Sequence, residues 1–83
     1  MAEQTAIPEA TEVLEADGET CATLTPLIRA TIRPLDSGSV LVVRTDDPAA
    51  RAGVPAWSRL TGNELVATVE EDDGHTRFYL RKK

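Results

Sequence analysis

The chain has 83 residues, nine Lys and Arg against 14 Asp and Glu, and a formal net charge of −5, so it holds one small domain and not two. Hydrophobic residues at 41% and charged residues at 28% are ordinary for a folded protein, which argues against pervasive disorder and fibrous architectures. A single Cys and a single His exclude an internal disulfide and deprive a structural zinc site of its usual ligands, so we expect no metal and no cofactor.

The negative charge is concentrated near the N-terminus. Six of the 14 acidic residues lie within residues 1–20, which leaves eight acids against nine bases in residues 21–83. This nearly neutral remainder has no clustered basic stripe, so direct nucleic-acid binding is disfavoured. The chain also has no positively charged start with a signal-like apolar run and no stretch of about 18 apolar residues, so we expect a cytoplasmic protein that does not enter a membrane.

Residues 1–10 lack a sustained apolar pattern and are predicted to form a flexible N-terminal tail, which leaves residues 11–83 as a single domain. A short strand is predicted within residues 11–16, because Asp17 and Gly18 form a turn signal directly after it.

The first helix is predicted from apolar residues that recur at spacings of three or four, as one buried helix face requires. These residues are Leu24, Leu27, Ile28, Ile32 and Leu35. If Thr25 caps the helix and Pro26 occupies its first position, Cys21 stands in a loop about one turn before it. Pro34 disfavours helical geometry at Arg33, so the helix should end near that residue.

The continuous apolar run at residues 40–43 predicts a strand covered on both faces. A strand, a helix and a second strand in succession predict a crossover that joins parallel neighbours. Asp47 followed by Pro48 predicts the start of a second helix, which Gly62 ends. Because Gly53 and Pro55 follow early in this helix, we expect an irregular start, with the more regular part beginning near residue 54.

The remaining chain is predicted to form a hairpin with its turn at residues 72–74. Its first strand would place Leu65, Ala67 and Val69 on one face, and its second strand would place Phe78 and Leu80 on one face. The complete order is β-α-β-α-β-β. We therefore predict an α+β fold, a two-layer α/β sandwich whose four-stranded mixed sheet carries both helices on one face.

Cys21 is the single cysteine and a candidate nucleophile, and two interpretations of it stay open: an inert buried residue or a reactive thiol.

His75 follows three acidic residues, but a hairpin turn usually leaves such charges in solvent, so we expect no ligand role for it. Asp46 and Asp47 are better explained as capping groups than as a catalytic pair. Trp57 is expected to fill the core between the helices and the sheet.

Three arginines, Arg29, Arg33 and Arg59, are candidates for a basic rim that guides an acidic partner protein. They lie on the two predicted helices. Solvated helix faces are the commoner explanation for such charges, and both interpretations remain open.

Several local strings occur in an order that resembles the TusA (SirA-like) family of small sulfur-carrier proteins, over residues 12 to 83. The strings are Leu14-Glu15-Ala16-Asp17-Gly18 ahead of Cys21, a glycine at Gly38, Thr45-Asp46-Asp47-Pro48-Ala49-Ala50, Val54-Pro55-Ala56-Trp57, Gly62-Asn63-Glu64-Leu65 and Phe78-Tyr79-Leu80-Arg81-Lys82. The resemblance implies that Cys21 accepts a sulfane sulfur from a cysteine desulfurase or another donor protein as a persulfide. The sulfur would then pass to an acceptor protein in tRNA thiolation, molybdenum-cofactor assembly or sulfur metabolism, which is a sulfurtransferase-type activity.

The chain departs from this family at the cysteine itself. The family motif is Cys-Pro-x-Pro, whereas this chain reads Cys21-Ala22-Thr23-Leu24, with a proline only at Pro26. The alternative hypothesis is therefore a non-catalytic interaction or regulatory module that keeps the fold.

Overall fold

The computed structural model describes residues 10–83, so nearly all of the predicted N-terminal tail lies outside the described residues. Its elements follow the predicted order and confirm the α+β class. They are β1 (Glu12–Glu15), α1 (Cys21–Ile32), β2 (Val40–Thr45), α2 (Ala50–Thr61), β3 (Glu64–Glu70) and β4 (Thr76–Arg81). No helix in this part of the chain has the length and apolar character needed to cross a membrane.

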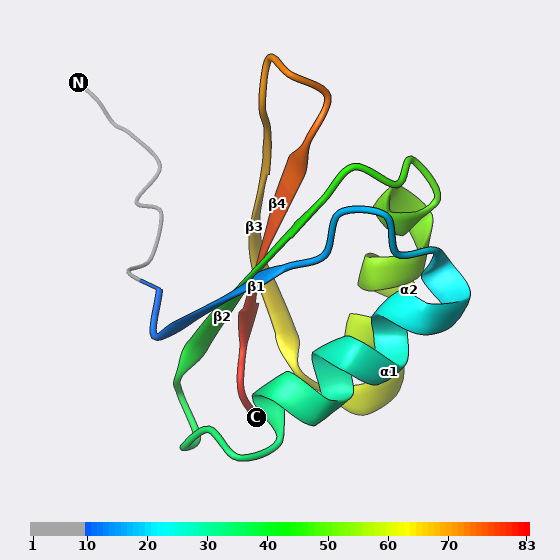
Figure 1. The fold of residues 1–83 in the computed structure, drawn as a ribbon. Helices are drawn as coiled ribbons and strands as arrows, with labels where there is room; N and C mark the ends of the chain where they lie inside the picture. Colours follow the sequence, from blue (N-terminus) through cyan, green and yellow to red (C-terminus); the bar gives the residue numbers. More distant parts are fainter. Residues whose placement is uncertain (1–9) are drawn as a thin grey trace, which may run out of the picture.

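The four strands form one mixed sheet in the order β1-β2-β4-β3. β1 pairs with β2 in parallel, and β4 pairs antiparallel with both β2 and β3. Both helices pack on the same side of this sheet, as predicted (Figure 1). Because β1, β2 and β3 run in the same direction, the loops that follow them, at residues 16–20, 46–49 and 71–75, gather at one end of the sheet.

The core lies between the helices and the sheet. Its fully or almost fully buried members include Leu24, Ile28 and Ile32 from α1, Leu41 and Val43 from β2, Val54 and Trp57 from α2, and Phe78 and Leu80 from β4. Trp57 is 8% exposed, which confirms its prediction as a core residue, and Phe78 and Leu80 share the buried face of β4 at 1% and 0% exposed. Leu27, which the spacing placed in the buried stripe, is instead 36% exposed.

A register shift in β3 makes the predicted one-sided pattern of that strand wrong. Leu65 pairs with Leu80 and packs against the core on the helix side, whereas Ala67 pairs with Tyr79 and packs on the opposite face. The shift lies between Leu65 and Ala67, and one extra residue in a strand turns the following side chains to the other face. Val69 follows Ala67 on that opposite face.

The predicted late start of α1 is also wrong, because the helix begins at Cys21 and includes Pro26. The Thr20 N–H donates to the Thr23 side-chain oxygen at 3.1 Å, one half of a capping box. The earlier start makes Leu24 part of α1, and this residue is 0% exposed, as its place in the predicted buried stripe requires. The capping contact between Thr20 and Thr23 and the burial of Leu24 together outweigh the loss of the one backbone hydrogen bond that Pro26 cannot donate.

α2 runs without a break from Ala50 to Thr61. Its start is irregular, as expected, because the N–H groups of Ala50, Arg51 and Ala52 donate to carbonyls three residues earlier. The Asp47 carboxylate accepts the Ala49 N–H at 3.0 Å and so holds the turn before α2, but the N-cap is Ala49 and no side chain caps the helix, so the predicted capping role of Asp47 is wrong. The helix ends at Gly62, whose φ of 81° is the left-handed geometry that glycine adopts without strain.

The end of α1 is held by a lysine from the far end of the chain. The Lys82 ammonium donates to the carbonyl oxygens of Ile32 at 3.3 Å, Arg33 at 2.8 Å and Leu35 at 3.0 Å. These carbonyls follow the last helical turn, where acceptors lack intrahelical donors and the helix dipole favours a cation.

We predict that Lys82→Met lowers the free energy of unfolding by about 1–2 kcal/mol, because it leaves three carbonyls without their charged donor. Urea unfolding followed by circular dichroism measures the change. Lys83→Met is the matched control, since it removes the same charge at the next position without removing these bonds. Equal losses in both variants would contradict the capping role.

Candidate functional site

Cys21 is the first residue of α1, directly after the extended N-cap residue Thr20, whose φ and ψ are −90° and 169°. The backbone N–H groups of Thr23 and Leu24 both donate to the Thr20 carbonyl, at 3.0 and 2.7 Å. Within residues 10–83, no protein group accepts the N–H of Ala22. The helix end at Cys21 therefore keeps an unpaired donor and a partial positive charge, which favour an anion.

The loop before Cys21 is attached to both neighbouring loops at this end of the sheet. The Gly18 N–H donates to the Asp46 carboxylate at 3.2 Å, so Asp46 contacts the β1–α1 loop instead of capping α2 as predicted. The Asp17 carboxylate lies 2.9 Å from Nε2 of His75, which comes from the β3–β4 turn. Two side-chain contacts thus position the segment that leads into α1.

Arg44 is the centre of a charge network at the same end of the sheet. Its guanidinium lies 3.3 Å from Glu15, 3.0 Å from Glu71 and 3.1 Å from Asp73, and 3.9 Å from Asp17. Arg44 was not among the residues expected from the sequence to belong to a site. The signal was a lone charge directly after the apolar run of a central strand, where an unpaired cation is costly.

His75 was expected to lie in solvent, but its side chain is only 17% exposed and contacts two carboxylates. Its Nδ1 lies 2.9 Å from Asp73, opposite the Nε2 contact with Asp17. The Asp73 and Asp17 carboxylates raise the pKa of His75 above its ordinary value of 6.5, although burial and the charge of Arg44 oppose them. Hydrogen bonds from His75 in turn lower the pKa of Asp73.

A metal ion is not needed to explain why Asp17, Asp46 and His75 lie close together. Ligand atoms of Asp17, Asp46 and His75 lie within 4.8 Å of one another. The His75 ion pair and the Gly18 hydrogen bond already engage the two carboxylates. We therefore assign no metal to them.

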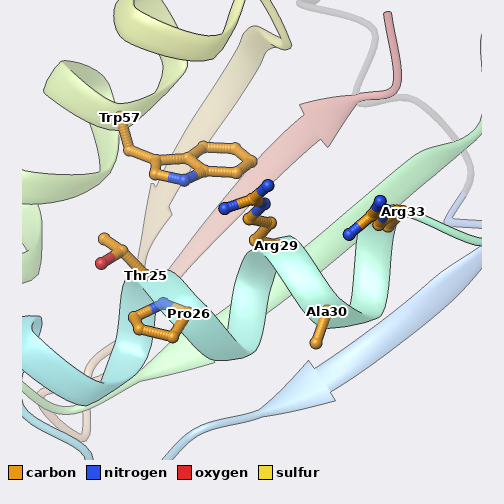
Figure 2. Close-up of a pocket in the computed structure, with 6 residues that line it drawn as sticks. All are labelled: Thr25, Pro26, Arg29, Ala30, Arg33 and Trp57. Carbon is orange, nitrogen blue, oxygen red and sulfur yellow. The ribbon is translucent and has the colours of Figure 1, made fainter.

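A basic groove of about 490 Å³ runs between the two helices. It is lined by Thr25, Pro26, Arg29, Ala30, Arg33 and Trp57. Figure 2 shows the Trp57 indole reaching from α2 toward Arg29 on α1, with Arg33 one turn further along that helix. Trp57 is thus both a core residue and a wall of this groove.

The structure separates the three arginines that the sequence analysis grouped. Arg29 and Arg33 line the groove together. Arg59 instead lines a different hollow of about 270 Å³ near the end of α2, with Pro55 and Gly62 among its neighbours.

Comparison with known proteins agrees with this architecture. The family model described as Sulfurtransferase TusA matches residues 12–82. The crystal structure of a SirA-like protein from Desulfitobacterium hafniense superposes with a TM-score of 0.76 at 18% sequence identity, over 86% of this chain and 96% of that chain. At this identity the structural likeness shows a shared fold.

We predict that Arg44→Met lowers the free energy of unfolding at pH 7, because Glu15, Glu71 and Asp73 would then repel one another without their common cation. The loss should shrink as the pH falls below about 4, where carboxylates become protonated and no longer need a cation. Urea unfolding at pH 7 and at about pH 3 measures both values.

Arg51→Met is the control for Arg44→Met, since Arg51 forms a single exposed ion pair with Glu70 at 3.1 Å. It should leave stability unchanged at both pH values. A pH-independent loss in Arg44→Met would contradict the electrostatic explanation.

Proposed function

The chain belongs to the TusA sulfurtransferase family, and from this premise we propose that it is a sulfur carrier that holds one sulfane sulfur on Cys21 as a persulfide. The observation that carries the proposal is the position of Cys21 as the first residue of α1. The family match over residues 12–82 includes this position.

The start of a helix stabilises both the free thiolate of such a carrier and its loaded persulfide. Only a thiolate attacks a persulfide efficiently, and an ordinary cysteine with a pKa of about 8.5 is mostly protonated at neutral pH. Helix N-termini lower thiol pKa values in general, because their unpaired N–H groups and partial positive charge favour the anion. The same groups would hold the terminal sulfur of the loaded persulfide, which is also an anion.

The proposed transfer exchanges one sulfur–sulfur bond for another. The Cys21 thiolate attacks the terminal sulfur of the donor's cysteine persulfide, and a new bond forms between Cys21 and that sulfur. The donor's sulfur–sulfur bond breaks, and the donor cysteine leaves as a thiolate with the bonding electron pair. No external oxidant or reductant is required, and the same exchange with an acceptor thiol unloads the carrier.

The donor and acceptor are proposed to be proteins that dock beside α1. Arg29 and Arg33 place two positive charges in the groove lined by Trp57, and Arg29 lies about 12 Å along the helix from Cys21, at 1.5 Å per residue. A partner with an acidic surface, such as a cysteine desulfurase, would be attracted to this groove while its persulfide reaches the helix start. We place this exchange in the cytoplasm, where a lone thiol remains reduced.

The alternative is a non-catalytic interaction module, for which the missing Cys-Pro-x-Pro motif is the argument. A late helix start, which would have separated Cys21 from the helix end, was the physical basis of that argument. Since α1 begins at Cys21 without the motif prolines, that basis no longer applies.

We predict that incubation with a cysteine desulfurase and free cysteine adds the mass of one sulfur atom to the protein. Intact-mass spectrometry under non-reducing conditions measures the gain, and dithiothreitol should remove it. Cys21→Ser should gain nothing, because a hydroxyl cannot accept the sulfur. If the native protein gains no sulfur from desulfurases that load another carrier in the same assay, the interaction module is the correct reading.

We also predict that the double variant Arg29→Glu/Arg33→Glu slows desulfurase-dependent loading about tenfold or more at low salt, because it reverses both charges of the groove. Arg59→Glu, which changes a charge in the separate hollow, should have a much smaller effect. Loading rates at several desulfurase concentrations separate weaker docking from slower transfer. Equal effects of the two variants would contradict docking at the groove.

A further inference from the structure

His75 lies in the β3–β4 hairpin, yet it contacts the loop that leads into Cys21. We propose that protonated His75 is a positioning residue that clasps this loop, residues 16–20, to the β3–β4 turn and so fixes the start of α1. The loop's importance for sulfur transfer rests on the proposed function, whereas the clasp itself does not.

The clasp depends on both ring nitrogens of His75. Nε2 lies 2.9 Å from Asp17 in the loop, and Nδ1 lies 2.9 Å from Asp73 in the turn. A protonated imidazole carries an N–H at both nitrogens and a positive charge between two carboxylates. The Nδ1 contact with Asp73 is an ion pair that lacks hydrogen-bond geometry, so it depends on the positive charge that a neutral imidazole loses.

The charged groups around His75 come from every element packed at this end of the sheet. Asp17 belongs to the β1–α1 loop, Asp46 to the β2–α2 loop, and Glu71 and Asp73 to the β3–β4 turn. Arg44 on β2 is the opposing charge. The carboxylates prevail, and they raise the pKa of His75.

The direction of the pH dependence follows from this raised pKa. A group whose pKa is higher in the folded protein stabilises it fully below its ordinary pKa, which is 6.5 for His75, and loses that contribution as the pH rises through the raised value. Asp73, whose pKa is lowered, sets the opposite limit, because its contribution is lost as the pH falls through the lowered value. The clasp should therefore hold between the lowered pKa of Asp73 and the raised pKa of His75, and release as the pH rises above the latter.

Loss of the contact between His75 and Asp17 would affect the backbone segment directly before Cys21. Asp17 is followed by Gly18, whose N–H bonds to Asp46, and by Glu19, whose N–H donates to the Ala16 carbonyl at 3.2 Å. Thr20, the N-cap of α1, comes next. A loosened Asp17 thus frees the backbone that presents the cap and the first helical residue.

Backbone hydrogen exchange measured by NMR tests the clasp directly. In the native protein, the protection factors of the Gly18 and Glu19 amides should fall roughly three- to tenfold as the pH rises through the titration of His75. His75→Gln, which keeps a polar side chain without the charge, should show lower protection and no step. Asp72→Asn, a neighbouring turn carboxylate without a contact to His75 among the described residues, should behave like the native protein.

Asp17→Asn is the second variant, in case His75→Gln fails to fold. It removes the charge of one partner and keeps the side-chain size, so the imidazole pKa should move down toward 6.5 and the step should move with it. Native and His75→Gln proteins with the same pH profile of protection, or an Asp17→Asn variant with an unmoved step, would overturn the clasp.

Sulfur loading across the same pH range separates the clasp from the proposed function. If both hold, the native-to-His75→Gln ratio of loading rates should decline through the His75 titration. A protection step in a protein that never accepts sulfur would retain the clasp and reject the carrier. Sulfur loading without a protection step would retain the carrier and reject the clasp.

Discussion

The parallel pairing of β1 with β2 brings the candidate site together. Together with the antiparallel hairpin of β3 and β4, it sends three loops to one end of the sheet. Cys21, Asp46 and His75 come from these three parts of the chain, and no pair of them is close in sequence. A strand reversed at any of these positions would place its loop at the opposite end.

The start of α1 illustrates a competition between local preference and burial. Pro26 is best accommodated near a helix start, and on local grounds the helix would begin there. An earlier start brings Leu24 into the core stripe of Ile28 and Ile32, all of them at most 3% exposed. Burying a leucine contributes about 1.5–3 kcal/mol, which is comparable to the cost of a proline inside a helix of about 3 kcal/mol, and the Thr20 and Thr23 cap adds to the burial side.

Charges at the site end of the sheet are paired, but carboxylates outnumber cations there. Arg44 pairs with carboxylates from β1, from the β1–α1 loop and from the β3–β4 turn, and its side chain is 25% exposed. On the helix side, by contrast, Arg29 and Arg33 line a groove with no acidic residue in its lining. The molecule therefore presents an acidic network around Arg44 at one end and a basic groove between its helices.

The sequence by itself determined the order of the elements, because each leaves a signal in the local sequence. Examples are the apolar run of β2, the periodic buried stripe of α1 and the glycine that follows α2. It also singled out Cys21 as the candidate nucleophile and Trp57 as core. Only the tertiary structure decided where α1 starts, which face Ala67 occupies, and that Arg59 lies apart from Arg29 and Arg33. Burial of Leu24 decided the start of α1, the register shift against β4 decided the face of Ala67, and the packing of the two helices decided where the arginines lie. The tertiary structure also decided the pairing of His75 with Asp17, 58 residues apart, because neither a bulge nor a long-range ion pair leaves a periodic trace in the chain.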